Sequence, residues 1–423
     1  MKKNTTWQNR AAQTLKECRH ASYAMSQLNS RVKAQLLNEV ARELMKQKRT
    51  ILIENAKDLA EAKKHGLSPA MMDRLTLNSR RISDMAQGVR AVAGLGDPVG
   101  RITSRWRRPN GLVISRITVP IGVILIIYES RPNVTVECAS LCLKSGNVVL
   151  LRGGREAFYS NKILAQIFQK VLKRRRLPQA CVSFVSTTDR KAVDFLLKRD
   201  QDIHLVIPRG GEALIRKVAR TSRIPVIKHY QGICHVYIDR RADLKKAGNI
   251  VFNAKMQRPG VCNAMETLLV HRKIAPQFLP TIGKRLIESG CELRADAASR
   301  RYLPGAKAAK GSDYGHEYLD KILAVKTVPG LHEALEHIRR YGSGHTDAIV
   351  TRDKNAAEIF KKEVDSSSVM VNASTRFSDG FQYGFGAEIG ISTDKIHARG
   401  PMGLEGLTSY KYLVEGSGQI RTS

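Results

Sequence analysis

The sequence lacks any long apolar segment. A helix needs roughly 20 consecutive apolar residues to cross a bilayer, and the longest apolar run, from Ile121 to Tyr128, has only the length of a strand. The basic N-terminus is followed by no apolar stretch of the kind found in secretory signals. We therefore expect a cytoplasmic protein with no membrane segment.

Cysteine patterns that build disulfide frames or zinc sites are also absent. The 7 cysteines are odd in number and scattered, none stands in a C-x-x-C pair, and no group of His residues has the spacing of metal ligands. Disulfide-rich domains and zinc sites both depend on regular spacing. The sequence therefore predicts reduced thiols and no metal.

Acidic residues and aromatics are scarce. The 71 Lys and Arg face 38 Asp and Glu, which gives a formal net charge of +33, and aromatics make up 6% of the chain. Such an excess favours nucleic-acid binding, because neutralisation of phosphates dominates that affinity. The basic residues are spread over every region, however, and few aromatics are available to stack on bases. We expect no specific nucleic-acid partner; a basic nucleic-acid-binding protein that lacks catalysis is kept as an alternative.

The chain is long enough for two or three domains, and its first half predicts an α/β domain. A helical pattern runs from about Trp7 to Val92, with Ser68 and Pro69 as a helix start. Strands are then expected at 122–127, 148–152, 182–185 and 204–208, separated by helices at 133–144, 160–173 and 189–198, with another helix after Gly210. Near-continuous apolar strands that alternate with helices indicate a parallel sheet, which binds ligands at the carboxyl ends of its strands.

A second α/β unit follows after about Asp239. Helices are expected at 274–289, 331–342 and 355–364, and strands at 322–328, 346–351 and 368–372. The segment 294–317 is rich in Gly, Ala and Lys, so we expect a mobile surface loop there.

Residues 101–118 form a pattern of their own. Two short alternating stretches flank Pro109, Asn110 and Gly111, and Asn-Gly is the favoured pair for a tight hairpin turn. The edges of a projecting hairpin need a partner.

The segment 253–270 places a cysteine on a turn that enters a strand. Arg258, Pro259 and Gly260 interrupt regular structure before Cys262, and an apolar run follows. Backbone N–H groups at a turn, together with a guanidinium such as that of Arg258, lower the pKa of a thiol and can hold an oxyanion. Cys262 is therefore a candidate nucleophile, and the alternative is a cysteine that packs as a small apolar residue.

Six stretches, in order along nearly the whole chain, carry a resemblance to a known family. They are 120–154 (PIGVILIIYESRPNVTVECASLCLKSGNVVLLRGG), 207–211 (IPRGG), 224–239 (IPVIKHYQGICHVYID), 257–270 (QRPGVCNAMETLLV), 363–380 (EVDSSSVMVNASTRFSDG) and 384–412 (GFGAEIGISTDKIHARGPMGLEGLTSYKY). Together they resemble the gamma-glutamyl phosphate reductase family of the aldehyde dehydrogenase superfamily.

The resemblance implies an aldehyde-dehydrogenase-like α/β fold with two parallel-sheet domains and a small oligomerisation β-ribbon. The cofactor-binding domain would hold residues 1–100 and 119–238, and the catalytic domain residues 239–395, with the active site in the cleft between them. The ribbon would hold 101–118 and the C-terminal segment 396–423, with 409–416 as the companion strand of the hairpin. Since ribbons of this superfamily pair with another subunit, we expect a homo-oligomer.

The implied activity is NADPH-dependent reduction of L-glutamyl 5-phosphate to L-glutamate 5-semialdehyde and phosphate, a step of proline biosynthesis functionally linked to glutamate 5-kinase. Cys262 would form a thioester. Lys228 and His229 stand near the place where thioester-hydrolysing members carry a glutamate. This missing carboxylate favours the acyl-phosphate reaction, with an aldehyde dehydrogenase of another substrate as the alternative.

The resemblance also implies further catalytic residues. Asn133 is the candidate side-chain donor to the oxyanion, beside the Cys262 backbone N–H; it could equally cap the helix after Pro132. His229 and His235 are candidates for moving protons, although a packing or surface role is the more common one for a histidine.

Cofactor and substrate residues follow from the same stretches. Arg152 stands where a superfamily lysine approaches the adenosine ribose, and an arginine can also meet a 2′-phosphate. Glu317 resembles the glutamate that binds the nicotinamide ribose, or is a solvated side chain. The glycine pairs follow strands and precede helices, as phosphate sites do, or are plain turns: Gly153, Gly154, Gly210 and Gly211. Four arginines are candidates for the substrate's carboxylate and phosphate, or for structural ion pairs, and Arg376 is favoured for the carboxylate: Arg131, Arg258, Arg376 and Arg399.

Overall fold

The computed structural model describes residues 5–421 and contains two α/β units. Unit 1 comprises the chain up to Lys228 together with Gly384–Gly390 and the residues from Met402 onward, and unit 2 comprises His229–Tyr383 and Ile391–Pro401. The first boundary precedes β7 (Cys234–Ile238), whereas the sequence predicts it after 238. It lies earlier because β7 pairs with β8 (Met265–His271) and β12 (Thr346–Val350) of the second sheet.

Unit 1 is built on a four-stranded parallel sheet in which every strand is one that the sequence predicts. In spatial order its strands are β5 (Val182–Phe184), β4 (Val148–Arg152), β3 (Val123–Tyr128) and β6 (Leu205–Arg209). All residues of the two central strands, β3 and β4, are buried, because apolar side chains on both faces are covered. The connecting helices are α6 (Pro132–Lys144), α7 (Phe158–Arg174), α8 (Lys191–Leu196) and α9 (Glu212–Thr221), with short 3₁₀ turns at η1 (Arg155–Ala157) and η2 (Gln179–Cys181).

The N-terminal region supplies five further helices: the first packs against β3 and β4, and the second, third and fifth pack on α6 or α7. They are α1 (Thr5–Ser26), α2 (Ser30–Lys46), α3 (Lys48–Lys64), α4 (Pro69–Leu75) and α5 (Ser79–Gly94). The side chains of Asn29 and Ser68 each accept a hydrogen bond from a first-turn N–H, so both act as helix N-caps. Ser68 and Pro69 form the helix start that the sequence predicts.

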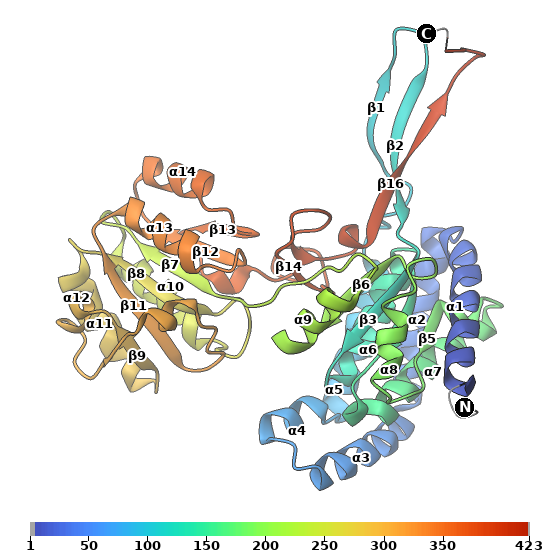
Figure 1. Ribbon diagram of the computed structural model, residues 1–423, viewed down its shortest axis with the longest axis horizontal. Helices are drawn as coiled ribbons and strands as arrows, with labels where there is room; N and C mark the ends of the chain where they lie inside the picture. The colour runs from blue at the N-terminus through green and yellow to red at the C-terminus, as the bar shows by residue number, and fades with distance from the viewer. Residues whose placement is uncertain (1–4, 422–423) are drawn as a thin grey trace. The chain divides into compact units, whose positions relative to one another are not determined.

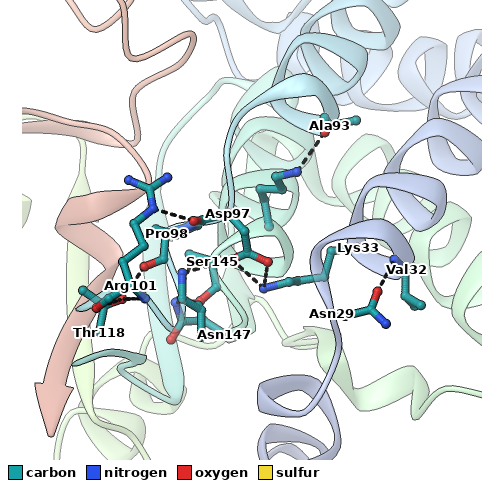
Figure 2. Close-up of polar contacts among 12 residues, drawn as sticks. Asn29, Val32, Lys33, Ala93, Asp97, Pro98, Arg101, Thr118, Ser145 and Asn147 are labelled. Carbon is teal, nitrogen blue, oxygen red and sulfur yellow. Dashed lines mark hydrogen bonds and ion pairs between the residues drawn. The ribbon is translucent and has the colours of Figure 1, made fainter. Parts of the chain in front are cut away.

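A polar junction joins the helices to the ribbon (Figure 2). The Nζ of Lys33 in α2 lies 2.6 Å from Oδ2 of Asp97, and Lys33 is almost wholly buried. Arg101 Nε donates to the backbone oxygen of Asp97 over 2.7 Å, and the Arg101 N–H donates to Thr118 Oγ1. Lys144 at the end of α6 donates to the carbonyl of Ala93. The segment that leads into the ribbon is thus tied to α2 by the Lys33–Asp97 ion pair, and α6 is tied to α5 by the bond from Lys144 to Ala93.

The predicted hairpin and its companion strand form a three-stranded antiparallel ribbon that extends past the helices of unit 1 (Figure 1). Its strands are β1 (Ile102–Arg107), β2 (Val113–Pro120) and β16 (Thr408–Glu415), with β2 in the centre. Gly111 has φ +90° in the turn between β1 and β2, a conformation that glycine adopts readily. Several large apolar side chains of the ribbon are exposed: Ile102, Trp106, Tyr410, Tyr412 and Val414.

Unit 2 contains a seven-stranded parallel sheet whose strands, in spatial order, are β10 (Lys307–Ala308), β9 (Glu292–Ala295), β11 (Ile322–Val328), β8, β7, β12 and β13 (Ser368–Val371). Successive side chains of β7 enter different clusters: Val236 and Ile238 pack with α10 (Leu244–Met256) and α11 (Ala275–Glu288), and Tyr237 packs with α13 (Leu331–Tyr341) and α14 (Lys354–Glu363). The alternation places helices on both faces. The remaining sheet strands are β11 (Ile322–Val328) and β13 (Ser368–Val371) at their predicted places, and the pair β9 and β10.

The prediction of a mobile loop at 294–317 is wrong. This segment overlaps β9 (Glu292–Ala295) and contains α12 (Ala297–Arg300), β10 (Lys307–Ala308) and η3 (Gly311–Gly315). Arg294 bonds Glu292 over 2.8 Å and Asp313 over 2.7 Å, so charged side chains fix a stretch whose composition alone suggests a loop.

The remaining elements are short. They are the 3₁₀ turns η4 (Thr375–Phe377) and η5 (Glu405–Leu407), and a two-stranded sheet of β14 (Gly390–Ser392) and β15 (Gly400–Met402). No helix between residues 5 and 421 combines the length and apolar composition that crossing a bilayer requires.

Candidate active site

Cys262 lies on the turn between α10 and β8, as the sequence predicts. It is half-buried, whereas the other six cysteines are buried. Burial raises the pKa of these six thiols, to about 11 for Cys18 and Cys291 and about 12 for Cys138 and Cys181, with Cys142 and Cys234 well above the ordinary value. A buried thiol with a raised pKa is a poor nucleophile, so Cys262 is the one suited to chemistry.

Two residues of a neighbouring stretch hold the Cys262 backbone. The Cys234 thiol donates to the carbonyl oxygen of Cys262 over 3.2 Å. A Cβ built at Gly232 would stand 2.6 Å from the carbonyl carbon and Cα of Cys262, so only glycine fits there. The N–H of Gly232 in turn donates to Glu317 Oε1 over 2.9 Å. Sequence reasoning missed the roles of Gly232 and Cys234, whose only signal is their place in the matched stretch 224–239.

Arg258 and Arg376 bring positive charge to this turn. Burial, and then the charge of Arg258, lower the pKa of the Arg376 guanidinium, on which the Cys262 thiol also acts electrostatically. Arg376 Nε donates to Gln257 Oε1 over 2.8 Å. Asn263, which sequence reasoning also missed, donates to the Ser378 carbonyl over 2.8 Å and ties the turn to the segment after η4. The favoured arginine of the sequence analysis thus lies beside the candidate nucleophile.

Arg399 is held differently. Its guanidinium donates to Asp365 Oδ1 over 2.7 Å and to the Asp365 carbonyl over 2.6 Å. This arrangement matches the alternative role that the sequence analysis gives for each candidate arginine, a structural ion pair.

A buried ion pair brackets the Cys262 turn. Lys255, near the end of α10, lies 2.6 Å from Glu266, in the second position of β8, and both side chains are at most 1% exposed. The second carboxylate oxygen of Glu266 accepts from the N–H of Leu319, which has φ +52°. Burial raises the pKa of Glu266 to about 7, although the charge of Lys255 opposes the shift. Sequence reasoning missed this pair; a glutamate inside an apolar strand was the available signal.

The two histidines of the stretch 224–239 occupy different environments. His235 is fully buried, and its Nδ1 lies 2.9 Å from Asp347 Oδ1. This environment corresponds to the packing role given above as the alternative for a histidine. His229 is half-buried, with Nδ1 3.0 Å from the carbonyl of Ile391.

In unit 1, the candidate oxyanion donor Asn133 lies in the first turn of α6. Arg131 is the N-cap residue and Pro132 the first helical residue, so Asn133 does not occupy the cap. Its Nδ2 donates to Glu137 Oε1 over 2.8 Å. Ser130, which precedes the N-cap residue Arg131, has φ +21°. Glu156 Oε1 accepts hydrogen bonds from the Ser130 N–H and from its hydroxyl, each over 2.7 Å.

Both glycine pairs follow strands of the unit 1 sheet. A Cβ at Gly153 would overlap the side chain of Asn161, and one at Gly210 would stand 2.5 Å from Glu129 Oε2. The N–H of Gly211 donates to the same Glu129 oxygen over 2.9 Å. Backbone without side chains therefore lies at the carboxyl ends of β4 and β6, where a dinucleotide binds in parallel sheets.

Arg152 is largely buried at the end of β4. Its guanidinium donates to the carbonyl of Gly153 over 2.7 Å and to that of Thr188 over 3.2 Å, and burial lowers its pKa. Beside it, a cavity of about 640 Å³ opens between the residues that follow β4 and β5 and the ends of α3 and α4. Its size, place, and mixture of apolar, hydroxyl and charged lining fit the adenosine end of a nicotinamide dinucleotide. Within residues 5–421, no group of three or more His, Cys, Asp or Glu could hold a metal ion.

Comparisons with known proteins match most or nearly all of the chain. The family model described as "Aldehyde dehydrogenase family" matches residues 4–295. The chain is similar to gamma-glutamyl phosphate reductase of Carboxydothermus hydrogenoformans, with 55% identity over 96% of this chain and 98% of that protein. The crystal structure of gamma-glutamyl phosphate reductase from Thermotoga maritima has a TM-score of 0.95 and 45% identity, covering 97% of this chain and 99% of that one. An engineered glycolyl-CoA reductase with bound NADP⁺, 14% identical, shares the fold with a TM-score of 0.66 over 96% of each chain.

Proposed function

The chain belongs to the aldehyde dehydrogenase family and, within it, to the gamma-glutamyl phosphate reductases, and we propose that it makes L-glutamate 5-semialdehyde from L-glutamyl 5-phosphate in proline biosynthesis, with NADPH as the reductant. The observation that carries the proposal is the state of its cysteines. Cys262 alone is partly exposed, on a turn beside Arg258 and Arg376.

Cys262 performs the covalent step. Its thiolate forms a bond to the carbonyl carbon of the acyl phosphate, and the bond from that carbon to oxygen breaks as phosphate leaves with the electron pair, so a thioester remains. A nicotinamide cofactor, when bound, supplies a hydride. The sulfur of Cys262 then leaves as thiolate when the aldehyde forms, and the thiolate is restored.

The developing negative charge needs N–H donors, and we assign one to the backbone N–H of Cys262, with Asn133 as the candidate side-chain donor. Arg376 and Arg258 offer guanidinium groups to the substrate's carboxylate and phosphate. Arg131 keeps its proposed substrate role, whereas the bonds of Arg399 to Asp365 favour a structural one. Lys228 and His229 stand near the place where thioester-hydrolysing members carry a water-activating glutamate. Without that carboxylate, a thioester on Cys262 has no base there to promote its hydrolysis.

Cofactor binding is proposed for two sets of residues. In unit 1, Gly153, Gly154, Gly210 and Gly211 let the dinucleotide phosphates approach the backbone, and Arg152 shapes the ribose end. In unit 2, Glu317 is proposed to bind the nicotinamide ribose, and its bond to Gly232 fixes one carboxylate oxygen.

We further propose that the protein forms a homo-oligomer through its ribbon. The exposed apolar side chains of β1 and β16, Trp106 and Tyr412 among them, favour burial against a second copy. We expect the enzyme to act in the cytoplasm on substrate supplied by glutamate 5-kinase.

The test runs the reaction in reverse. NADP⁺, glutamate semialdehyde and phosphate are mixed with the protein, and absorbance of the reduced nicotinamide is followed for wild type, Cys262→Ala, and Cys291→Ala as the matched buried-cysteine control. Phosphate-dependent turnover that is lost in Cys262→Ala and kept in Cys291→Ala is expected. Full turnover by Cys262→Ala would refute the covalent mechanism, and turnover without phosphate would indicate an aldehyde dehydrogenase of another substrate.

A further inference from the structure

A second cavity of unit 1 lies away from the strand ends that are proposed for the cofactor. It has a volume of about 640 Å³ and is lined by residues of α2 and α5 and by Arg175, which directly follows α7. α7 begins at Phe158, which lines the cavity beside β4, and its 17 residues span about 25 Å at 1.5 Å per residue. The two cavities therefore lie at opposite ends of α7.

Every described residue that lines this second cavity is polar or charged. The lining residues are Gln35, Asn38, Glu39 and Arg42 of α2, Arg90 of α5, and Arg175. Cavities that bind uncharged organic ligands are mainly apolar, unlike this one. Among the described residues no aromatic ring lines it, so it offers no stacking surface to a nucleotide base. The lining suits a compact ligand that carries charge on several of its groups.

Positive charge exceeds negative charge in this cavity. Glu39 is the one carboxylate among the described lining residues, and its Oε1 accepts a hydrogen bond from Nη2 of Arg175 over 2.6 Å. Arg42 and Arg90 are exposed, and neither has a hydrogen-bond or ion-pair partner within residues 5–421. Two guanidinium groups of the lining can therefore bind a ligand without breaking an existing bond.

The next carboxylate of α2 does not neutralise these arginines. Glu43 is almost wholly buried, and its oxygens lie 2.8 Å from Lys170 Nζ and 2.7 Å from Arg174 Nη1. The hydrogen bond from Lys170 lowers the pKa of Glu43 to about 2. Unpaired basic residues are numerous in a chain with a net charge of +33. Here, however, two of them line one cavity, where an anion would relieve their repulsion.

We propose that this cavity is a binding site for oligophosphates, with pyrophosphate as the simplest ligand. Arg42 and Arg90 stand on different helices, so a ligand that bonds both needs at least two anionic groups. Two linked phosphates supply these groups, and a guanidinium pairs bidentately with phosphate. The side-chain amides of Gln35 and Asn38 add N–H donors for further phosphate oxygens. The site takes no part in the reaction proposed above.

Calorimetric titration with sodium pyrophosphate at fixed ionic strength tests the proposal. The proteins compared are wild type, the double variant Arg42→Ala with Arg90→Ala, and the double variant Arg31→Ala with Arg80→Ala. Arg31 and Arg80 are exposed arginines of the same two helices outside the cavity lining, so the second double variant removes the same charge.

The first double variant is expected to bind pyrophosphate roughly 100-fold more weakly than wild type, because each charge-assisted contact is worth about a factor of 10. The second double variant should bind it as wild type does. Pyrophosphate that binds at the proposed cofactor or substrate site gives the same signal in all three proteins. The difference between the two double variants therefore reports on this cavity alone.

Glu39→Gln should change the affinity in the opposite direction. It removes the carboxylate of the cavity and releases the guanidinium of Arg175, so pyrophosphate should bind about 2- to 5-fold more tightly. A folding defect would weaken binding, so this gain cannot arise from misfolding. Unchanged or weaker binding by Glu39→Gln would contradict the proposed site.

Three further results would overturn the proposal. The first is a wild type that binds no pyrophosphate, or that binds it with the affinity of Arg42→Ala with Arg90→Ala. The second is equal weakening in both double variants, which would indicate diffuse attraction to a basic surface. The third is an Arg42→Ala with Arg90→Ala variant that loses affinity for an oligothymidylate but keeps its affinity for pyrophosphate, which would assign the two arginines to nucleic acid.

Discussion

Gly232 lies directly against the backbone of Cys262, so that a Cβ at position 232 would stand 2.6 Å from the Cys262 Cα and nearer still to its carbonyl oxygen. Side-chain clashes can be relieved by rotation, but this one is with backbone. The position of the Cys262 sulfur therefore depends on the absence of a side chain at position 232, which lies 30 residues earlier in the segment that precedes β7.

Gly232→Ala is expected to displace the Cys262 turn and lower kcat by about 100-fold, because an error of about 1 Å in a reacting group costs that much. The control is Gly248→Ala in α10, where a Cβ meets nothing within 4 Å. Alanine there should keep kcat and leave stability equal or improved by up to about 1 kcal/mol. Steady-state kinetics and urea unfolding of both variants provide the measurement. Normal kcat in Gly232→Ala would mean that the turn tolerates displacement.

Iodoacetamide at neutral pH is expected to modify Cys262 first. Activity should fall in proportion to the fraction of Cys262 that is modified. The other six thiols are buried, and burial raises their pKa values. Intact-protein mass spectrometry should show a single adduct in wild type and none in Cys262→Ala over the same time. A second cysteine that reacts equally fast in the folded protein would contradict the assignment.

Glu266→Leu is expected to destabilise the protein by about 3–5 kcal/mol, because it leaves Lys255 buried without a counter-charge. The double variant Lys255→Met with Glu266→Leu should recover most of that loss, since apolar residues of similar volume can replace a buried pair. Urea unfolding of the single and double variants gives the coupling. If the double variant is as unstable as the single one, the pair does not act as a unit.

His337 is expected to make unit 2 sensitive to acid. Burial, then the neighbouring charges of His235, Lys326 and Arg340, lower its pKa from 6.5 to about 3. A depressed histidine pKa contributes stability that is present above pH 6.5 and is lost as the pH falls toward 3. His337→Phe keeps the contacts with Tyr314 and Tyr341 and should reduce the loss of unfolding free energy by up to about 1.4 kcal/mol per pH unit in this range.

His332→Phe is the control for this prediction, because His332 is exposed on the same helix, α13. Chemical unfolding at several pH values between 7 and 4 should give wild-type acid dependence for His332→Phe and a shallower one for His337→Phe. Equal slopes in all three proteins would show that His337 does not titrate on unfolding in this range.

The sequence predicts most of the fold because the signals are local. Apolar runs such as 148–152 have strand length, and Ser68 with Pro69 marks a helix start that needs no distant partner. The segment 294–317 was misjudged because composition suggests a loop, whereas β9 and β10 are stabilised by pairing with each other and by Arg294 with Asp313. β7 was assigned to the wrong side of the unit boundary for the same reason, since its pairing partners come much later in the chain.

The candidate site divides in the same way. Pro259 and Gly260 before an apolar run were enough to place Cys262 on a turn, and the matched stretches supplied Arg258 and Arg376. Gly232 and Glu266 were missed because their contacts with Cys262 and Lys255 appear only after folding.

β2 of the ribbon and β3 of the central sheet are separated by Ile121 and Gly122 alone. Gly122 has φ +122° and lies against His204, whose Nδ1 accepts from the N–H of Val123 over 3.0 Å. The connection is therefore short, and its end at β3 is held by a hydrogen bond. A pull on the ribbon along its length is transmitted to β3, and from there to Ser130 and Arg131 at the head of α6, so mechanical load on the ribbon and the geometry of that loop are not independent.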